Sequence, residues 1–317
     1  MNVLVMGFYG KQNLGDELFK DAFKTLFPQY TFTFVDHINA SSLDGIQYVI
    51  FGGGSLLEGK PAITTDALEL LKTKTLLYIG VGSETNTHPV HTDLLKQAKL
   101  VALRSTEGFE KIRTLCPNKV ITSSDLVFAL QSSIHSQANT GSLLFLPNVS
   151  ITPQNHSKYW EHLHWQTFKL EMSQVLDRLV EDGYKIGFLP FCTHPKTSDV
   201  AAASELINAM KWRDERYIVS CKSDFASVCE TMSKYEVIVS QRYHGLVLSE
   251  MLGKPYVAIC HHDKLSTASV RNGLYTSYYG LNKKTMLDLI AQAKNVVIPK
   301  QKHSFDELIY EVSRIMV

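Results

Sequence analysis

The residues best suited to chemistry are an arginine and a histidine that stand two apart in the sequence, Arg242 and His244. They follow an apolar run over 237–239, which predicts a buried strand, and precede a helical pattern over 245–252. Residues two apart in an extended segment point the same way, so we expect both side chains on one side. A fixed cation beside an imidazole at a helix N-terminus can hold an anion and move a proton. A lone histidine is more often structural, but this placement favours a functional pair.

A glycine-rich turn, 7–17, follows the first apolar run of the chain. Glycines let the backbone approach a ligand, and the N-terminus of the helix that follows offers N–H groups to an anion. The spacing is neither that of a Walker A loop nor that of a dinucleotide fingerprint. The alternative is an ordinary strand-to-helix turn whose acidic residues complement the helix dipole. The candidate ligand-binding residues of this turn are Asn13, Gly15, Asp16 and Glu17.

A second glycine cluster, Gly52, Gly53 and Gly54, ends the apolar run over 46–51 and is followed by Ser55. Three consecutive glycines are costly in chain entropy, so we infer that a ligand needs this backbone close by. The alternative is a tight turn under a helix, with Ser55 as the helix N-cap. One glycine would be enough for such a turn, which favours the ligand-binding loop.

Two further cations stand after apolar runs: Arg104 follows 100–103, and Lys264 follows 256–260. Each is expected at the carboxyl end of a strand, where ligands of open α/β sheets bind. The alternative for Arg104 is a surface ion pair, for instance with Glu107. For Lys264 we favour a cation that contacts a bound anion.

Two adjacent histidines, His261 and His262, also follow the run 256–260. Neighbours in a strand point to opposite sides, so the two imidazoles cannot both bind one metal ion from a strand. We therefore expect no metal site. Two aspartates, Asp125 and Asp199, are candidates for orienting partners or for helix caps, and a cap is favoured for Asp199.

The elements that must position these residues alternate along the chain. Mostly apolar runs of strand length are followed by helical patterns, as is typical of parallel sheets buried on both faces. A length of 317 residues favours two domains. We predict two doubly wound, Rossmann-like α/β domains with a cleft between them. The predicted bounds are 1–133 for the N-terminal domain, 143–300 for the C-terminal domain and 303–317 for a terminal helix that could pack back on the N-terminal domain, with the polar stretch 131–142 as linker.

Composition narrows the class of protein. The 32 basic and 31 acidic side chains give a formal net charge of +1, which argues against a nucleic-acid-binding protein. An anionic ligand must then be held by a few local cations. Five cysteines without a paired spacing indicate reduced thiols, and no signal peptide or membrane-spanning segment is recognisable. We expect a cytoplasmic protein.

These segments, taken in order, resemble those of the polysaccharide pyruvyl transferase family. The resemblance rests on Gly10 with the segment Asn13–Glu17, on Gly52–Ser55, on Arg104, on Arg242-Tyr243-His244-Gly245 and on Lys264. It covers most of the chain. The chain departs from the family pattern at two places: Ser105 and Gly108 stand where the family has an aspartate and a serine, and His261 and His262 replace a tyrosine and an aspartate.

The resemblance implies a fold similar to GT-B glycosyltransferases and a role in polysaccharide biosynthesis. It implies that phosphoenolpyruvate, as co-substrate and without other cofactor, gives its pyruvyl group to a sugar diol as a cyclic ketal, releasing phosphate. Phosphoenolpyruvate carries about three negative charges. Arg104, Arg242 and Lys264 would hold it, beside Gly245 as a binding residue. The catalytic residues would be Arg242 and His244, with His244 as general acid/base. The N-terminal domain would bind the carbohydrate acceptor and the C-terminal domain the donor.

Two other functions stay open at this stage: a GT-B-like glycosyltransferase that uses a nucleotide sugar, and a carbohydrate- or anion-binding protein without catalysis. The acceptor sugar and the oligomeric state cannot be derived from the sequence. Four aromatic residues, Tyr159, Trp160, Trp165 and Phe168, could form a platform for a sugar. Their helical spacing favours core packing instead.

Overall fold

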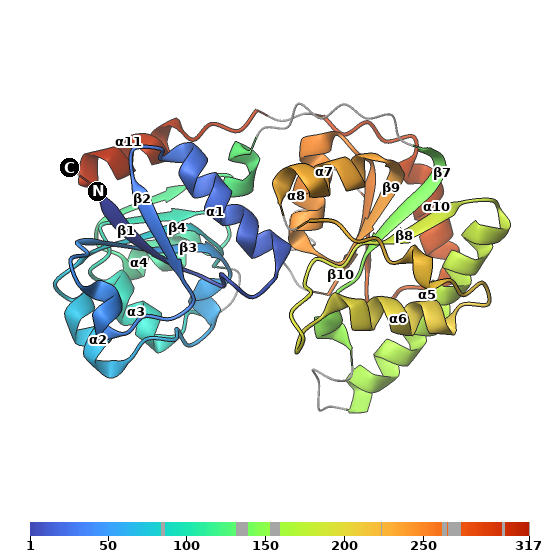
Figure 1. Ribbon diagram of the computed structural model, residues 1–317, viewed down its shortest axis with the longest axis horizontal. Helices are drawn as coiled ribbons and strands as arrows, with labels where there is room; N and C mark the ends of the chain where they lie inside the picture. The colour runs from blue at the N-terminus through green and yellow to red at the C-terminus, as the bar shows by residue number, and fades with distance from the viewer. Residues whose placement is uncertain are drawn as a thin grey trace. The chain divides into compact units, whose positions relative to one another are not determined.

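The chain folds into two compact units, Met1–Gln131 with Lys302–Val317, and Ser132–Gln301. A computed structural model describes residues 1–83, 86–130, 139–152, 159–222, 224–261, 265, 274–299 and 302–316. Each unit is built on one sheet in which all paired strands are parallel, with helices connecting them (Figure 1). The prediction of two doubly wound α/β domains is therefore confirmed. The predicted cleft between them stays a prediction, and each unit is described below by itself.

The sheet of the first unit has six strands in the order β2-β1-β3-β4-β5-β6. The strands are β1 (Asn2–Met6), β2 (Thr31–Val35), β3 (Tyr48–Gly54), β4 (Thr75–Val81), β5 (Leu100–Leu103) and β6 (Lys119–Thr122). The helices are α1 (Leu14–Leu26), α2 (Thr65–Leu71), α3 (Pro89–Leu95), α4 (Phe109–Leu115) and α11 (Asp306–Ile315). The central strands are buried on both faces, which explains their apolar, non-alternating sequences.

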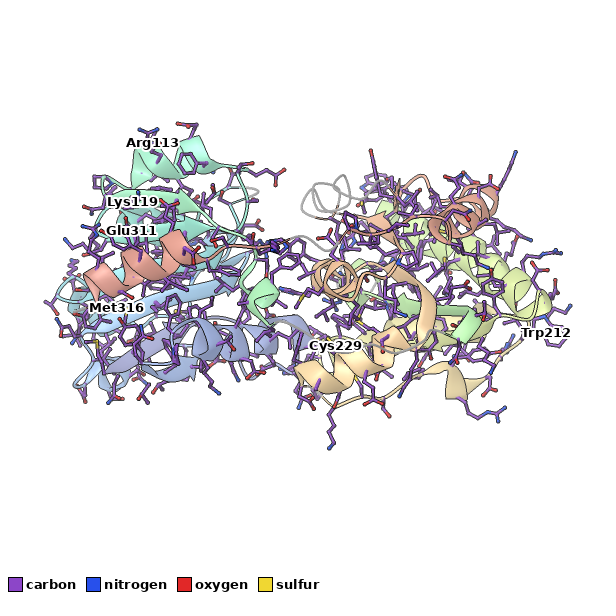
Figure 2. The ribbon with its side chains drawn as sticks, turned by 90° about the horizontal axis from the view of Figure 1, so that it is seen from above. Arg113, Lys119, Trp212, Cys229, Glu311 and Met316 are labelled. Atoms are coloured by element: carbon purple, nitrogen blue, oxygen red, sulfur yellow. The ribbon has the colours of Figure 1, made fainter. Side chains whose placement is uncertain are left out.

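The C-terminal helix α11 belongs to this first unit and contacts β5. Lys119 Nζ lies 3.3 Å from Glu307 Oε1 at the start of this helix, and the Tyr30 hydroxyl donates to the Met316 carbonyl at 3.2 Å. Figure 2 shows Glu311 of this helix near Lys119, with Nζ and Oε1 3.7 Å apart. Polar contacts and an apolar helix face thus attach the end of the chain to its beginning.

The sheet of the second unit has five strands in the order β11-β10-β9-β7-β8. The strands are β7 (Asn139–Leu146), β8 (Lys185–Phe188), β9 (Tyr235–Ser240), β10 (Tyr256–Cys260) and β11 (Tyr275–Ser277). The helices that the text below uses are α5 (Tyr159–Glu181), α6 (Asp199–Ala209), α7 (Phe225–Ser233), α8 (Tyr243–Leu252) and α10 (Lys283–Ala293). Helices α5, α6 and α10 share one core with one face of the sheet, whereas α7 and α8 contact each other and β9.

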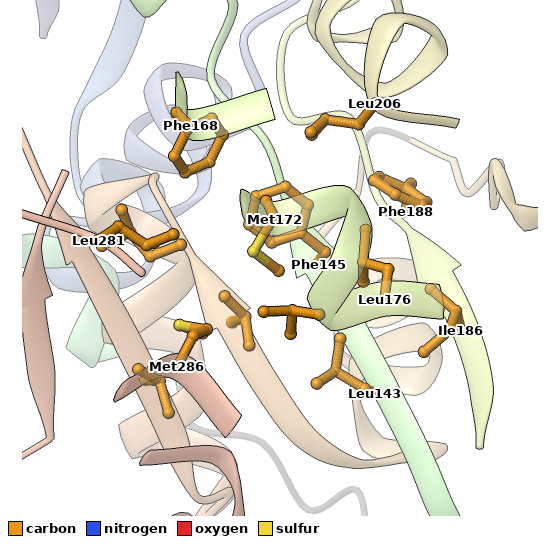
Figure 3. Close-up of a cluster of buried hydrophobic side chains, with 14 of the residues drawn as sticks. Leu143, Phe145, Phe168, Met172, Leu176, Ile186, Phe188, Leu206, Leu281 and Met286 are labelled. Atoms are coloured by element: carbon orange, nitrogen blue, oxygen red, sulfur yellow. The ribbon is translucent and has the colours of Figure 1, made fainter. Parts of the chain in front are cut away.

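The core of the second unit explains where its apolar residues point. Leu143 and Phe145 of β7 pack with Met172 and Leu176 of α5 and with Met286 of α10 (Figure 3). Burial of such side chains stabilises a domain by roughly 1.5–3 kcal/mol each. This core, and its counterpart in the first unit, holds the strand ends that carry the candidate site residues.

One predicted boundary is wrong: β7 begins at Asn139, inside the predicted linker 131–142. The polar residues at its start pair with β9 through hydrogen bonds instead of apolar packing. Asn139 N–H donates to the Lys234 carbonyl at 2.9 Å, and Glu236 N–H donates to Ser142 Oγ at 3.0 Å. The remaining part of the linker prediction, 131–138, lies outside the described residues.

The four aromatic residues near the start of α5 separate into two pairs. Trp165 and Phe168 are buried in the core, as core packing predicts, and their rings stack at a centroid distance of 5.6 Å. Tyr159 and Trp160 are 75% and 64% exposed, so these two side chains are not core residues. Within the described ranges, no helix has the length and apolar character that crossing a membrane requires.

Candidate functional site

The strand order of each sheet reverses next to its first strand, and this gives two places where a ligand can bind. In open α/β sheets, ligands occupy the crevice beyond the carboxyl ends of the strands at such a switch point. The switch lies between β1 and β3 in the first unit and between β7 and β9 in the second. The predicted residues 13–17 follow β1, residues 52–55 end or follow β3, and residues 242–245 follow β9.

The guanidinium of Arg242 is held at the switch point of the second unit. Arg242 is the N-cap residue of α8, and its Nη2 forms an ion pair with Asp199 Oδ1. Its Nε donates to the Pro147 carbonyl, which follows β7, at 3.4 Å. The side chain is 18% exposed, and these two bonds occupy two of the five guanidinium N–H groups. The other N–H groups have no acceptor among the described residues, so they can donate to an anion.

Asp199 is the residue that orients this guanidinium. Its carboxylate is fully buried, and Oδ1 also accepts from Val149 N–H at 2.9 Å. Oδ2 accepts from the backbone N–H groups of Phe191 at 3.1 Å and Cys192 at 2.8 Å. A buried charge is tolerated only when it is paired and hydrogen-bonded, and Asp199 satisfies both conditions. The segments that follow β7 and β8 are thereby tied to Arg242.

The favoured interpretation of Asp199 as a helix cap is wrong, because the cap is the preceding residue. Ser198 is the N-cap of α6, and its Oγ accepts from Val200 N–H at 3.3 Å. Asp199 is the first helical residue, and its side chain turns inward to Arg242. Asp125, the second aspartate considered from the sequence, does act as a cap: its Oδ1 accepts from Val127 N–H at 3.0 Å.

His244 lies in the first turn of α8, not in an extended segment. Gly245 N–H donates to the Arg242 carbonyl at 3.0 Å, so the helix begins immediately after Arg242. We expected Arg242 and His244 to point the same way because they would stand in one extended segment. That reason is wrong, because His244 is helical. The His244 imidazole is half-buried and packs edge-on against the Tyr243 ring at 5.3 Å. It still follows the carboxyl end of β9, two residues after Arg242.

Close packing explains why residue 245 is a glycine. A Cβ at this position would lie 2.3 Å from Ser240 Oγ and 2.6 Å from Leu146 Cδ2. The close approach lets α8 begin directly on the ends of β9 and β7. Ser240 Oγ also accepts from Arg242 N–H at 3.0 Å and donates to the Arg242 carbonyl at 2.8 Å, which fixes the backbone at the start of the helix.

Three residues that sequence reasoning did not assign to the site connect the ends of β7, β9 and β10. Asn148 N–H donates to Gln241 Oε1 at 3.0 Å, and Asn148 Nδ2 lies 3.0 Å from His261 Nε2. Asn148 Oδ1 accepts from Ser150 N–H at 3.0 Å, so its Nδ2 must be the donor to His261. The only signal in the sequence is their position just after strands. Lys264, predicted as a further cation here, lies outside the described residues, as does His262.

Arg104 in the first unit is buried, with 3% of its side chain exposed. Its Nη2 donates to Ser55 Oγ at 3.2 Å, and its Nη1 lies 4.0 Å from Asp125 Oδ2. The surface ion pair considered from the sequence therefore does not describe this residue. Arg104 connects the end of β3 with the turn after β6, and through Ser55 it supports the backbone next to the glycine triplet.

The glycine triplet is the end of β3, and two of its members are required by packing against α1. A Cβ on Gly52 would lie 2.8 Å from the Phe23 ring, and a Cβ on Gly53 would lie 2.5 Å from the Phe19 ring. Gly53 has a φ of +80° and Gly54 a φ of +69°, both in the region that favours glycine. Packing of α1 against the end of β3 is enough to explain why these positions are glycines. A ligand-binding role stays a prediction.

The turn after β1 carries carboxylates at the N-terminus of α1. Asn13 is the N-cap residue, but its Nδ2 donates to Asp16 Oδ2 at 2.6 Å instead of its side chain capping the helix. Glu17 Oε1 accepts from Gly10 N–H at 2.6 Å. Burial, with the charges of Asp16 and Glu17, raises the pKa of Tyr9 well above its usual value. Glu17 is also paired with Lys20, whose Nζ lies 2.5 Å from Glu17 Oε2. The carboxylate oxygens of this turn can accept hydrogen bonds from hydroxyl groups.

The two switch points thus differ in their polar groups: the turn after β1 carries Asp16 and Glu17, of which Glu17 is ion-paired with Lys20, and the second switch point carries the Asp199–Arg242 pair with an imidazole. Within the described part of the chain, no group of three or more His, Cys, Asp or Glu side chains could hold a metal ion. The arrangement can bind hydroxyl groups in the first unit and an oxyanion in the second.

The two parallel-sheet α/β units define the GT-B class of fold. UDP-GlcNAc 2-epimerase from Neisseria meningitidis, solved with UDP-GlcNAc bound, is similar with a TM-score of 0.60 at 10% identity, covering 100% of this chain and 99% of that chain. The epimerases from Rickettsia bellii (TM-score 0.57, 11% identity, 99% and 95% covered) and Methanocaldococcus jannaschii (0.55, 10%, 100% and 99%) are also similar. At this identity the likeness shows the fold alone. Comparison with curated proteins gives no match.

The family model of polysaccharide pyruvyl transferase matches residues 13–263. This range is most of the chain and includes the segments on which the resemblance rests, apart from Gly10 and Lys264 at its two ends. The protein belongs to the polysaccharide pyruvyl transferase family.

Proposed function

We propose that the protein transfers the pyruvyl group of phosphoenolpyruvate to two hydroxyl groups of a carbohydrate, forming a cyclic ketal and releasing phosphate. The observation that carries this proposal is the Arg242–Asp199 ion pair at the start of α8, beside His244 and at a switch point. The start of α8 thus carries an oriented cation, a helix N-terminus and a group that can transfer a proton. Family membership supports the transferase class.

The donor is bound through its negative charges. Phosphoenolpyruvate has a phosphate and a carboxylate, and a guanidinium binds either group through paired N–H donors. Because Asp199 fixes one edge of the Arg242 guanidinium, the remaining N–H groups are preorganised for the donor. The positive end of the α8 dipole adds to the attraction. Lys264 is proposed as a second cation, on the sequence alone.

The chemistry needs two proton movements. One hydroxyl of the acceptor adds to the carbon that carries the phosphate and loses its proton, while the methylene carbon gains a proton and becomes a methyl group, so the addition is balanced. The second hydroxyl then displaces phosphate from the same carbon, and its proton leaves with the phosphate. We assign His244 as the general acid/base for the first step, which contributes roughly 10²–10⁴-fold to the rate. The reaction needs no cofactor besides the donor itself.

The first unit is proposed to bind the acceptor. Asp16 and Glu17 carry oxygens that accept hydrogen bonds, which suits sugar hydroxyl groups. Arg104 is too deeply buried to be the main contact of the donor, so we assign it to holding Ser55 and the glycine triplet in place. All five cysteines are free thiols, in keeping with our proposal of a cytoplasmic reaction.

The experiment that tests this function compares donors. Purified protein is incubated with a panel of sugar diols and either phosphoenolpyruvate or nucleotide sugars, and released phosphate or nucleotide is measured. We expect phosphate release that depends on both phosphoenolpyruvate and a diol. Nucleotide release would favour a glycosyltransferase instead, and binding of phosphoenolpyruvate without release with every acceptor would favour a non-catalytic protein.

A further inference from the structure

Gln241 has a buried side-chain amide of which only the oxygen has a hydrogen-bond partner among the described residues. The residue follows β9, immediately before Arg242, and is 1% exposed. Its carbonyl Oε1 accepts from Asn148 N–H at 3.0 Å, so the side chain spans the switch point from the end of β9 to the end of β7. This bond fixes which end of the amide is oxygen. The Nε2 end carries two N–H donors, and no described residue accepts from it.

A buried donor without an acceptor is uncommon in native proteins and points to a missing partner. The partner must carry an acceptor atom, because an amide NH₂ only donates. Two features adjoining Gln241 also favour an acceptor with negative charge, namely the guanidinium of Arg242 and the N-terminus of the ten-residue helix α8. The Gln241 amide, the Arg242 guanidinium and the N-terminus of α8 all follow the carboxyl end of β9. An open α/β sheet binds its ligand at such a strand end.

We propose that Gln241 Nε2 donates to an oxygen of the donor anion, which makes Gln241 a further substrate-binding residue. The identity of that anion rests on the proposed function. The group that Gln241 binds is an oxyanion, either the phosphate or the carboxylate of the donor. Asn148 is then a positioning residue, because its N–H holds the amide so that the NH₂ group faces the ligand.

The substitution Gln241→Glu separates the two ends of the amide. One carboxylate oxygen can still accept from Asn148 N–H, whereas the other replaces the NH₂ donors by a negative charge. At pH 8 we expect the affinity of the variant for inorganic phosphate or for pyruvate, whichever group the amide binds, to fall by about tenfold or more. Titrations with the two probes separately show which group is recognised.

The pH dependence gives a readout that a structural role would not change. Protonation of the introduced carboxylate restores an O–H donor and removes the charge, so the affinity of the variant should approach that of the unchanged protein as the pH falls toward 5. The matched control is Gln174→Glu on the exposed face of α5, which changes the net charge equally. We expect this control to bind both probes as the unchanged protein does.

Equal affinity of Gln241→Glu and the unchanged protein for both anions at pH 8 would overturn the proposal. If the variant does not fold, the side-chain amide NMR signals of Gln241 in the unchanged protein provide the test. They should shift when phosphate or pyruvate is added, and no shift at saturation with either anion would contradict the proposal. A protein that binds these anions through Gln241 but releases no phosphate from phosphoenolpyruvate would contradict the proposed function alone.

Discussion

Asp199 and Arg242, 43 residues apart in the chain, form an ion pair in which the fully buried carboxylate holds a guanidinium that is 18% exposed. The carboxylate is itself fixed by three backbone N–H groups from the segments after β7 and β8. The cation is therefore oriented by the ends of three strands. This relationship gives the Arg242 guanidinium a defined direction, as the proposed anion-binding role requires, instead of leaving it a mobile surface charge.

Replacing Asp199 by Asn tests this orientation. The variant keeps the shape of the side chain but leaves the guanidinium without its counter-charge and at least one backbone N–H without its acceptor. We expect the free energy of unfolding to fall by about 2–4 kcal/mol, because removing one partner of a buried pair is destabilising. The KM for phosphoenolpyruvate should rise by about tenfold or more, measured by phosphate release.

The adjacent residue provides the control for that experiment. Ser198→Ala removes only the N-cap of α6, which should cost about 1 kcal/mol of stability and leave the KM for phosphoenolpyruvate unchanged. If Asp199→Asn also left this KM unchanged, orientation of Arg242 by Asp199 would not matter for binding.

The placement of Arg242, His244 and the glycine clusters could be predicted from the sequence because it depends on local features. An apolar run followed by glycine or a charged residue predicts a strand end in any parallel sheet, whichever strands are neighbours. The two switch points needed more information, since they depend on strand order. Gln241 and Asn148 are 93 residues apart, and only the pairing of β7 with β9 brings them together.

The reasons behind two predictions could not be derived from the sequence. A glycine triplet looks the same whether a ligand or a helix approaches it, and here the rings of Phe19 and Phe23 occupy the space. An aspartate at a helix start looks like a cap. Its inward turn to Arg242 depends on a half-buried cation that only the fold supplies.

Packing under α1 predicts a large effect of Gly53→Ala. The substitution forces a side chain into a φ of +80° and places its Cβ about where the Phe19 ring lies. Conformational strain and overpacking together should lower the free energy of unfolding by about 2–5 kcal/mol. Gly45→Ala is the matched control, since Gly45 has a φ of +67° but no atom within 4 Å of the added Cβ. Urea denaturation that gives equal losses for both variants would contradict the packing explanation.

The buried side chain of His91 leads us to predict that the protein loses stability in mild acid. The side chain is 1% exposed and contacts the Tyr78 hydroxyl at 3.0 Å, and burial, with a smaller effect of His88, lowers the pKa of His91 to about 4. The unfolded chain takes up the proton near pH 6.5, before the folded protein does. Stability from neutral His91 is therefore complete above pH 6.5 and falls by up to about 3 kcal/mol as the pH decreases toward 4.

Urea denaturation between pH 7 and 4.5 checks this dependence. We expect His91→Gln to be less stable than the unchanged protein at pH 7 but to lose less stability on acidification. The control His37→Gln, at a histidine whose side chain is 63% exposed, should keep the steep dependence. Parallel curves for His91→Gln and the unchanged protein would show that His91 is not the group responsible.

The central claim is the proposal that His244, at the proposed anion-binding end of the second unit, moves the proton that pyruvyl transfer requires. The most direct measurement is the rate of phosphate release from phosphoenolpyruvate, with a sugar diol present, by the unchanged protein and by His244→Ala. We predict release by the unchanged protein and a loss of about 10²–10⁴-fold in the variant, with circular dichroism and phosphate binding retained. Phosphate release by His244→Ala at the unchanged rate would contradict the claim.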